Sequence, residues 1–189
     1  MTELIQKKLS QEERNARRRE RMEKERLAKI AAIPDTLHGA PVVEIPYTAV
    51  RKKTVKAMRR EFTDVRKEFL KHLAKTMEPA LREMGLSDKA IAGMTKGESP
   101  SGFNTHHKIP LAGGGQNVFE NLILIKNDPY HTDFHEISDP QICVLKEGQT
   151  AMVRLPMPEG SVFIPPKEQQ KTQEAAPNAA LLRKMQNVR

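Results

Sequence analysis

The chain has 189 residues, which is enough for one ordinary domain with appendages and too few for two independent cores. Apolar residues make up 38% of it, aromatic residues 4% and charged residues 30%, so part of the chain should be solvated helix or tail rather than core. The 32 basic against 24 acidic residues give a net charge of +8, which favours an anionic partner, with nucleic acid ahead of an anionic membrane.

The single cysteine, Cys143, excludes a disulfide within the chain, and no Cys-x-x-Cys pair offers thiolates to a zinc ion. This usage predicts folding in a reducing cytoplasm. The N-terminus lacks the apolar segment of a Sec signal, and nowhere do 18 apolar residues follow one another. We therefore expect no membrane span and a cytoplasmic location in the producing cell. Delivery to the cytoplasm of a target cell would need a route other than Sec.

Residues 1–32 predict a charged helical arm. Residues 4–30 contain neither Gly nor Pro, and basic residues alternate with acidic ones. The apolar positions leave a gap between Leu9 and Met22, so no continuous face is available for burial. Two roles for the arm stay open, a plain solvated helix and a helix that docks on nucleic acid or on a component of a secretion system.

Three prolines and one glycine in residues 33–47 predict a linker, with room for a short strand at 42–45. The compact domain is expected to follow at 48–165. The remaining residues, 166–189, are polar and predict a fraying tail with at most one short helix at 179–185.

The domain should begin with an amphipathic helix at 48–83. Apolar residues recur every three or four positions from Val55 to Met77, as on the buried stripe of such a helix. Pro79 is expected to kink or split the helix, and Gly85 to end it.

The opposite face of this helix has an excess of basic residues that suits phosphate binding. An ordinary solvated helix face is the alternative. With one further lysine near the histidines described below, the candidate DNA-binding residues are Arg51, Lys52, Lys56, Arg59, Arg60 and Lys108.

Two smaller features complete the outline of the domain. Ser87 is expected to be the N-cap of a short helix that ends near Gly93 or Gly97. Residues 142–145, 150–155 and 161–164 alternate with Gly and Pro turns and predict a short C-terminal β element.

Four of the six histidines fall within thirty residues, in the segments FNTHHKIPLAGGG and DPYHTDFH. The simplest geometry is a strand at 103–107, a turn through three glycines, an apolar strand at 122–125 and then a helix. Asp128 fits the N-cap of that helix and Pro129 its first position, where a missing N–H costs nothing.

The spacing of these histidines predicts a metal site with a separate base. His131 and His135 are four apart, so both imidazoles lie on one helical face and can reach a single ion. His106 and His107 are adjacent on a strand, so their side chains point to opposite faces. One of this pair can complete a three-ligand site while the other deprotonates water, and hydrolysis of a phosphodiester needs both a cation and such a base.

The pattern His-His-x-x-Pro, Gly-Gly, Asn, Pro-x-His-x-x-x-His, over residues 102–136, resembles the HNH endonuclease superfamily. It is most similar to the nuclease domains of DNase colicins, S-type pyocins and polymorphic bacterial toxins. This resemblance implies an α+β fold with a ββα-metal (His-Me finger) catalytic core.

The resemblance also implies a role for each residue of the pattern. His106, His131 and His135 would bind one divalent metal ion, and the ligand types leave Mg, Mn, Ni and Zn open. His107 would be the catalytic general base. Asn121 would complete the catalytic set by bracing the loop and the base.

The chain departs from the colicin-type pattern at one position. Those domains have an acidic residue two positions before the His pair, where it helps to orient a catalytic Arg. Here Asn104 stands at that position and Glu98 is the nearest upstream acid, so the accessory Arg is unassigned. The resemblance covers none of the receptor-binding or translocation regions of colicins and implies no delivery route.

The sequence therefore predicts a metal-dependent DNA endonuclease with little sequence specificity, acting as a bacteriocin-like antibacterial toxin or effector. An acidic immunity protein is then an expected partner. A phage or mobile-element nuclease and a non-catalytic, metal-stabilised nucleic-acid-binding module are the alternatives. A structural zinc site is disfavoured, because such sites usually contain cysteine. His38 and His72 are isolated in the sequence and receive no role.

Overall fold

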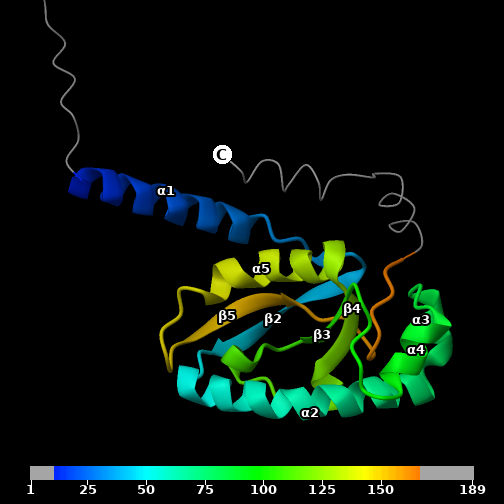
Figure 1. Ribbon diagram of the computed structural model, residues 1–189. Helices are drawn as coiled ribbons and strands as arrows, with labels where there is room; N and C mark the ends of the chain where they lie inside the picture. The colour runs from blue at the N-terminus through cyan, green and yellow to red at the C-terminus, as the bar shows by residue number, and fades with distance from the viewer. Residues whose placement is uncertain (1–10, 167–189) are drawn as a thin grey trace, which may run out of the picture. The chain divides into compact units, whose positions relative to one another are not determined.

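The computed structural model describes residues 11–166 (Figure 1). The predictions for residues 1–10 and for the tail at 167–189 lie outside the described residues. The chain divides into two compact units, Met1–Ile33 and Pro34–Arg189.

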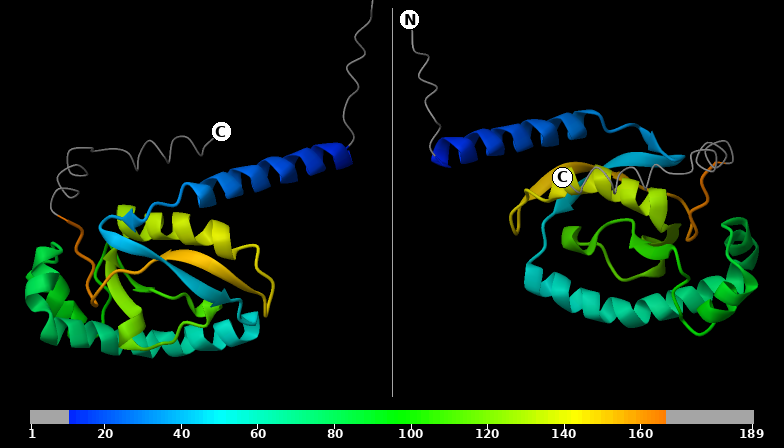
Figure 2. Two further views of the ribbon diagram at one scale, coloured as in Figure 1. Left: turned by 180° about the vertical axis from the view of Figure 1, so that it is seen from behind. Right: turned by 45° about the horizontal axis from the view of Figure 1, so that its top comes forward.

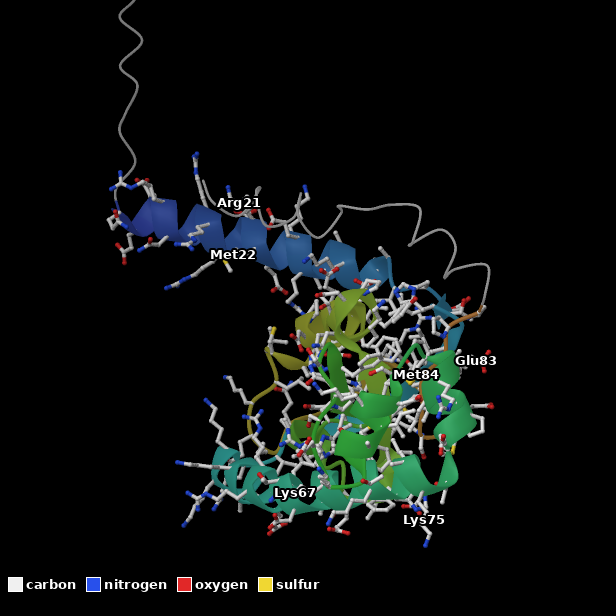
Figure 3. The ribbon with its side chains drawn as sticks, turned by 45° about the vertical axis from the view of Figure 1, so that its right-hand side comes forward. Arg21, Met22, Lys67, Lys75, Glu83 and Met84 are labelled. Carbon is white, nitrogen blue, oxygen red and sulfur yellow. The ribbon has the colours of Figure 1, made fainter. Side chains whose placement is uncertain are left out.

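The first unit contains helix α1 (Gln11–Ala31), in which no residue is buried. Its surface is a mixture of opposite charges, as in the ion pair between Arg26 and Glu23. Figure 3 labels Arg21 and Met22 on this helix, and Met22 is 55% exposed although it is apolar. The absence of a buried face on α1 agrees with the solvated helix that the sequence predicts.

The second unit contains a three-stranded antiparallel sheet in the order β1-β2-β5. Its strands are β1 (Thr36–Leu37), β2 (Ala40–Thr48) and β5 (Thr150–Pro156). The pairing of β2 with β5 is long and regular, and it runs from the Val42 and Pro156 pair to the Thr48 and Thr150 pair.

Residues 33–47, for which the sequence predicts a linker, instead contain β1 and most of β2. The prolines are compatible with a strand here because Pro41 is paired with β1 alone and Pro46 with β5 alone. Each proline therefore has a paired strand on one side only, which is where a strand tolerates proline. Tyr47, near the end of β2, is almost fully buried against Val153 and Leu155 of β5.

Three helices follow β2: α2 (Lys52–Thr76), α3 (Glu78–Glu83) and α4 (Asp88–Met94). The predicted helix at 48–83 is thus divided just before Pro79, as expected. It begins four residues later than predicted, because Thr48 still belongs to β2.

The ends of the two shorter helices follow the predicted signals. Gly85, directly after the last turn of α3, has a φ of +90°, which a residue with a side chain adopts only at a cost. Ser87 is the N-cap of α4, and its hydroxyl accepts a hydrogen bond of 3.3 Å from the backbone N–H of Ala90.

The histidine segment folds as two antiparallel strands, β3 (Phe103–His107) and β4 (Leu122–Lys126). The connecting loop contains two short 3₁₀ turns, η1 (Leu111–Gly113) and η2 (Phe119–Asn121). The predicted order of strand, glycine-rich loop and strand is therefore present.

A wide helical turn, η3 (Asn127–His131), leads from β4 into helix α5 (Thr132–Ile142). Asp128 has the extended backbone of an N-cap, but its side chain caps no backbone N–H. Its carboxylate instead accepts a hydrogen bond of 3.1 Å from the Thr132 hydroxyl. The extended backbone of Asp128 agrees with the predicted start, but the residues that follow it form the wide turn η3, and α5 itself begins only at Thr132. The predicted capping bond is wrong, because the Thr132 hydroxyl takes the carboxylate.

Strand β4 is the centre of the core, since its first four residues are completely buried. Leu122 and Leu124 pack with side chains of α2, α3 and α4 on one face. Ile123 and Ile125 pack with Phe134 of α5 on the other face. The strands consequently lie between α5 and α2 in opposite views of the molecule (Figures 1 and 2).

The predicted C-terminal β element is only partly present. Strand β5 covers 150–156, whereas 142–145 form the end of α5 and the turn after it. Within 161–164 a single bridge joins Val162 to Leu124. The fold is mixed α+β, as predicted, and none of the described helices is long and apolar enough to cross a membrane.

Candidate metal and nucleic-acid site

Three histidines from three elements, β3, η3 and α5, converge in the second unit. Nitrogen atoms of His106, His131 and His135 all lie within 4.8 Å of one another. The His131 and His135 ring centroids are 4.7 Å apart, and the His106 ring is 5.1 Å from the first and 5.4 Å from the second. The predicted metal ligands are thus brought together.

The register of the two-stranded sheet explains why His106 joins the helix. His106 is paired with Ile123, and paired residues share a face of a sheet. Ile123 packs on Phe134 of α5, so His106 also faces α5, and its ring lies 5.9 Å from that of Phe134. The position of His106 in the strand therefore places its imidazole against α5.

The surroundings of His106 and His131 favour the neutral form of both imidazoles. Burial, together with the neighbouring His131 and His135, lowers the pKa of His106 to about 3. Burial and His135 also lower the pKa of His131, and Asp128 partly opposes that shift. A neutral ring is the form that binds a metal ion. Three histidine nitrogens at this spacing suit one ion held at about 2.0–2.1 Å from each.

Asp139 contacts the third member of the cluster from one turn further along α5. Its Oδ1 lies 3.3 Å from Nδ1 of His135. A carboxylate at this nitrogen holds the proton there and leaves Nε2 as the unprotonated nitrogen, as in many metal-binding histidines. Asp139 was missed in the sequence, although its spacing of four from His135 was a signal for such a contact.

His107 points to the other face of the strand, as its adjacency to His106 predicts. Its ring lies 4.4 Å from that of Phe62 on α2, and its Nε2 is 2.9 Å from Oδ1 of Asn117. Burial lowers the pKa of His107, and the hydrogen bond with Asn117 partly opposes this shift. The ring is therefore neutral near pH 7 and separate from the three-histidine cluster.

Asn117 determines which nitrogen of His107 has the proton. The Asn117 side-chain N–H donates to the carbonyl of Met58 at 2.8 Å, so the Asn117 oxygen is the atom directed at His107. This oxygen only accepts hydrogen bonds, so Nε2 of His107 must be the donor. The other nitrogen, Nδ1, is then unprotonated and available as a base.

Asn121 braces the loop between the two strands, as the resemblance implies. Its side-chain oxygen accepts from the Ile109 N–H at 2.9 Å, and its side-chain nitrogen donates to the carbonyls of Ile109 and Gln116 at 3.0 Å each. A Cβ on Gly115 would lie 1.8 Å from the Ile109 carbonyl oxygen, so glycine is required beside this bridge. The expected contact with the base is made by Asn117 in place of Asn121.

A cavity of about 410 Å³ lies beside these groups. His106 and His107 both line it from β3, His135 and Asp139 from α5, and Arg59 from α2. The candidate base, one side of the histidine cluster and a cationic side chain therefore open onto the same space, which a phosphodiester group can enter.

The predicted DNA-binding residues fall into three environments. Lys52, Lys56, Arg59 and Arg60 are exposed along the first half of α2. Arg51 is also exposed, but its Nε lies 2.9 Å from the carboxylate of Glu147. Lys108 is half-buried, and burial lowers its pKa while Glu120 opposes the shift.

The second half of α2 differs in its charge. Lys67 pairs with Asp64 at 3.1 Å, and Lys71 pairs with Glu68 at 2.8 Å. Figure 3 labels Lys67 and Lys75 on this part of the helix. The excess of positive charge is therefore concentrated in residues 51–60, at the N-terminal end of α2. This segment includes Arg59, which lines the cavity.

Comparison with known proteins found one similar sequence, an Escherichia coli (strain K12) protein described as "Uncharacterized protein YhhZ". The two are 36% identical over 142 residues, which is 75% of this chain and 36% of the E. coli protein. The chain thus spans about a third of the length of that relative. No family model matches the chain. No solved structure matches it either.

Proposed function

We propose that this protein is a metal-dependent DNA endonuclease of the HNH type, in which β3, β4 and α5 form a ββα-metal core. One observation carries the proposal: three histidines converge within 4.8 Å, and a fourth, on the opposite face of the same strand, opens onto the same cavity. Separate sites for a cation and for a base are what hydrolysis of a phosphodiester needs.

In this proposal His106, His131 and His135 hold one divalent ion. The ion, when bound, would neutralise the negative charge that develops on the phosphate oxygens. His107 removes the proton from the attacking water through Nδ1, because Asn117 holds the proton on Nε2. Asn121 keeps the loop closed around this arrangement.

A nucleic acid is the proposed substrate because of the charge of α2, and the resemblance to the nuclease domains of DNase colicins favours DNA over RNA. Five basic residues are exposed within residues 52–60, and one of them, Arg59, also lines the cavity. Contacts of this kind are made with phosphates and read no base sequence, so the proposed cleavage has little sequence specificity. Because Arg59 lines the cavity, it is the candidate in this proposal for the accessory catalytic arginine that the sequence leaves unassigned.

The test is cleavage of supercoiled plasmid by protein stripped of metal and then supplied with Mg, Mn, Ni or Zn. We expect nicking that requires metal and falls by about 10²- to 10⁴-fold in His107→Ala. His72→Ala is the matched control, because His72 is an exposed histidine of α2 outside the cavity. Intact plasmid with every metal, together with retained DNA binding in a gel shift, would favour the non-catalytic binding module instead.

We also propose that the nuclease is an antibacterial toxin or effector with an acidic immunity protein as its partner. The basic charge of the chain and the resemblance to toxin nucleases support this role. Induced expression in E. coli should stop growth and degrade the chromosome, whereas expression of His107→Ala should do neither. Normal growth with a fully active enzyme would point to a phage or mobile-element nuclease.

A further inference from the structure

His38, the histidine in the turn between β1 and β2, contacts the helix segment that holds two of the candidate ligands. Its Nε2 lies 2.7 Å from Oδ2 of Asp133, and both side chains are mostly buried, with 15% and 19% of their surfaces exposed. Its ring also packs edge-on against Tyr130, with ring centroids 4.9 Å apart. These two contacts are made to residues on either side of His131 in the sequence.

The backbone of His38 is in a conformation that histidine does not favour. Its φ is +52°, and among residues 11–166 it is the one residue other than glycine with a positive φ. Together with Gly39 it forms a two-residue hairpin turn, in which Asn or Gly is usual at the first position. This conformation costs about 1–2 kcal/mol for a residue with a side chain. The side-chain contacts of His38 are the interactions that offset this cost.

The contact with Asp133 reaches the ligand helix from the side opposite the ligands. Residues two apart on a helix point in nearly opposite directions, so Asp133 faces away from His131, whereas His135 returns to the face of His131. No side chain caps the first turn of α5. The hydrogen bond between His38 and Asp133 therefore restrains the rotation of α5 about its own axis, at an end that no side-chain cap holds.

We propose that His38 and Asp133 are a positioning pair, which sets the rotation of the start of α5 so that His131 and His135 face His106. This inference rests on the proposed metal site. It assigns a role to a histidine that the sequence leaves without one, and it connects the β1–β2 turn to the metal ligands. Residues that orient metal ligands typically change metal affinity by 10- to 100-fold when they are removed.

The experiment is a titration of the metal-free full chain with Co²⁺, which reports affinity and, through its visible absorption bands, the geometry of the ligands. The main variant is His38→Asn. Asn tolerates the positive φ of the turn, so the backbone is kept, but its side chain is too short to bond Asp133 as histidine does. We expect Co²⁺ to bind at least about tenfold more weakly, with altered absorption bands.

Two further variants separate positioning from general stability. Asp133→Asn keeps an oxygen that accepts a hydrogen bond from His38 and should bind Co²⁺ nearly as well as the wild type, whereas Asp133→Ala should match His38→Asn. Asp35→Ala removes a different anchor of the hairpin region, the 2.7 Å ion pair with Arg154, and should leave Co²⁺ affinity unchanged.

Two results would overturn the inference alone. Either His38→Asn binds Co²⁺ with the affinity and spectrum of the wild type, or Asp35→Ala weakens binding as much as His38→Asn does. A different result would overturn the proposed metal site as well: the wild type and His106→Ala binding Co²⁺ equally weakly. The two failures are therefore distinguished by the wild-type titration.

Discussion

The side-chain oxygen of Asn117 accepts a hydrogen bond from Nε2 of His107, and the two atoms are 2.9 Å apart. Because the nitrogen of the same amide is bound to the carbonyl of Met58, the amide cannot rotate without losing both bonds. This relationship fixes the tautomer of the candidate base before any substrate binds.

Replacing Asn117 therefore tests the assignment of the base. In Asn117→Ala, His107 loses the acceptor that keeps the proton on Nε2, and we expect plasmid cleavage to fall by about tenfold or more. Co²⁺ affinity should not change, since Asn117 contacts none of the three ligands. Asn117→Asp retains an acceptor and should retain more activity than the alanine variant. Equal cleavage by all three proteins would show that the tautomer of His107 is not controlled here.

A second prediction concerns the two neighbouring glycines of the loop. Gly115→Ala places a Cβ against the Ile109 carbonyl and 2.9 Å from the Asn121 amide nitrogen, so it should disrupt the Asn121 bridge. In Gly114→Ala the new Cβ would have its nearest neighbouring atom 3.9 Å away, so only the positive φ of +87° makes this substitution unfavourable. We expect a cost of about 1 kcal/mol for Gly114→Ala and several times as much for Gly115→Ala, measured by urea unfolding. Similar costs for both would contradict the close approach.

A third prediction compares two sets of lysines and arginines on one helix. The triple variant Lys52→Ala, Lys56→Ala, Arg60→Ala should weaken DNA binding and reduce the dependence of affinity on salt, because exposed cations release counterions from phosphates. The control, Lys67→Ala with Lys71→Ala, removes cations already paired with Asp64 and Glu68 and should have a much smaller effect. The measurement is fluorescence anisotropy of labelled duplex DNA over a series of salt concentrations.

Metal binding should also increase the stability of the folded protein. A ligand that binds only the folded chain raises the free energy of unfolding by about 2.7 kcal/mol at a hundred times its dissociation constant. Added Zn²⁺ or Ni²⁺ should therefore raise the Tm, a chelator should reverse the increase, and His131→Ala should abolish it. His72→Ala should behave as the wild type. An unchanged Tm in the wild type at saturating metal would count against the site.

The parts of the site that follow local rules were predictable from the sequence. The spacing of His131 and His135 on a helix and the opposite directions of His106 and His107 depend only on helix and strand periodicity. Both are present in the structure, as are the division of the long helix before Pro79 and the cap at Ser87.

The parts that depend on distant contacts were not predictable. Asn117 bonds the carbonyl of Met58, 59 positions earlier, and nothing in the sequence around either residue indicates that contact. His38 similarly meets Asp133 across 95 positions. Residues 33–47 have the composition of a linker, and they become a strand because β5, far along the chain, provides the partner.

The pairing of β2 with β5 has a consequence for how the protein is made. The two strands meet across a separation of 102 residues at Thr48 and Thr150, and Gln141 of α5 bonds both backbone groups of Arg154 in β5. Contacts between such distant residues form slowly. On the ribosome, all four clustered histidines are synthesised before the strand that anchors their helix. The nascent chain therefore completes this arrangement only after residues 150–156 have been added, which delays the assembled site until the domain is nearly finished.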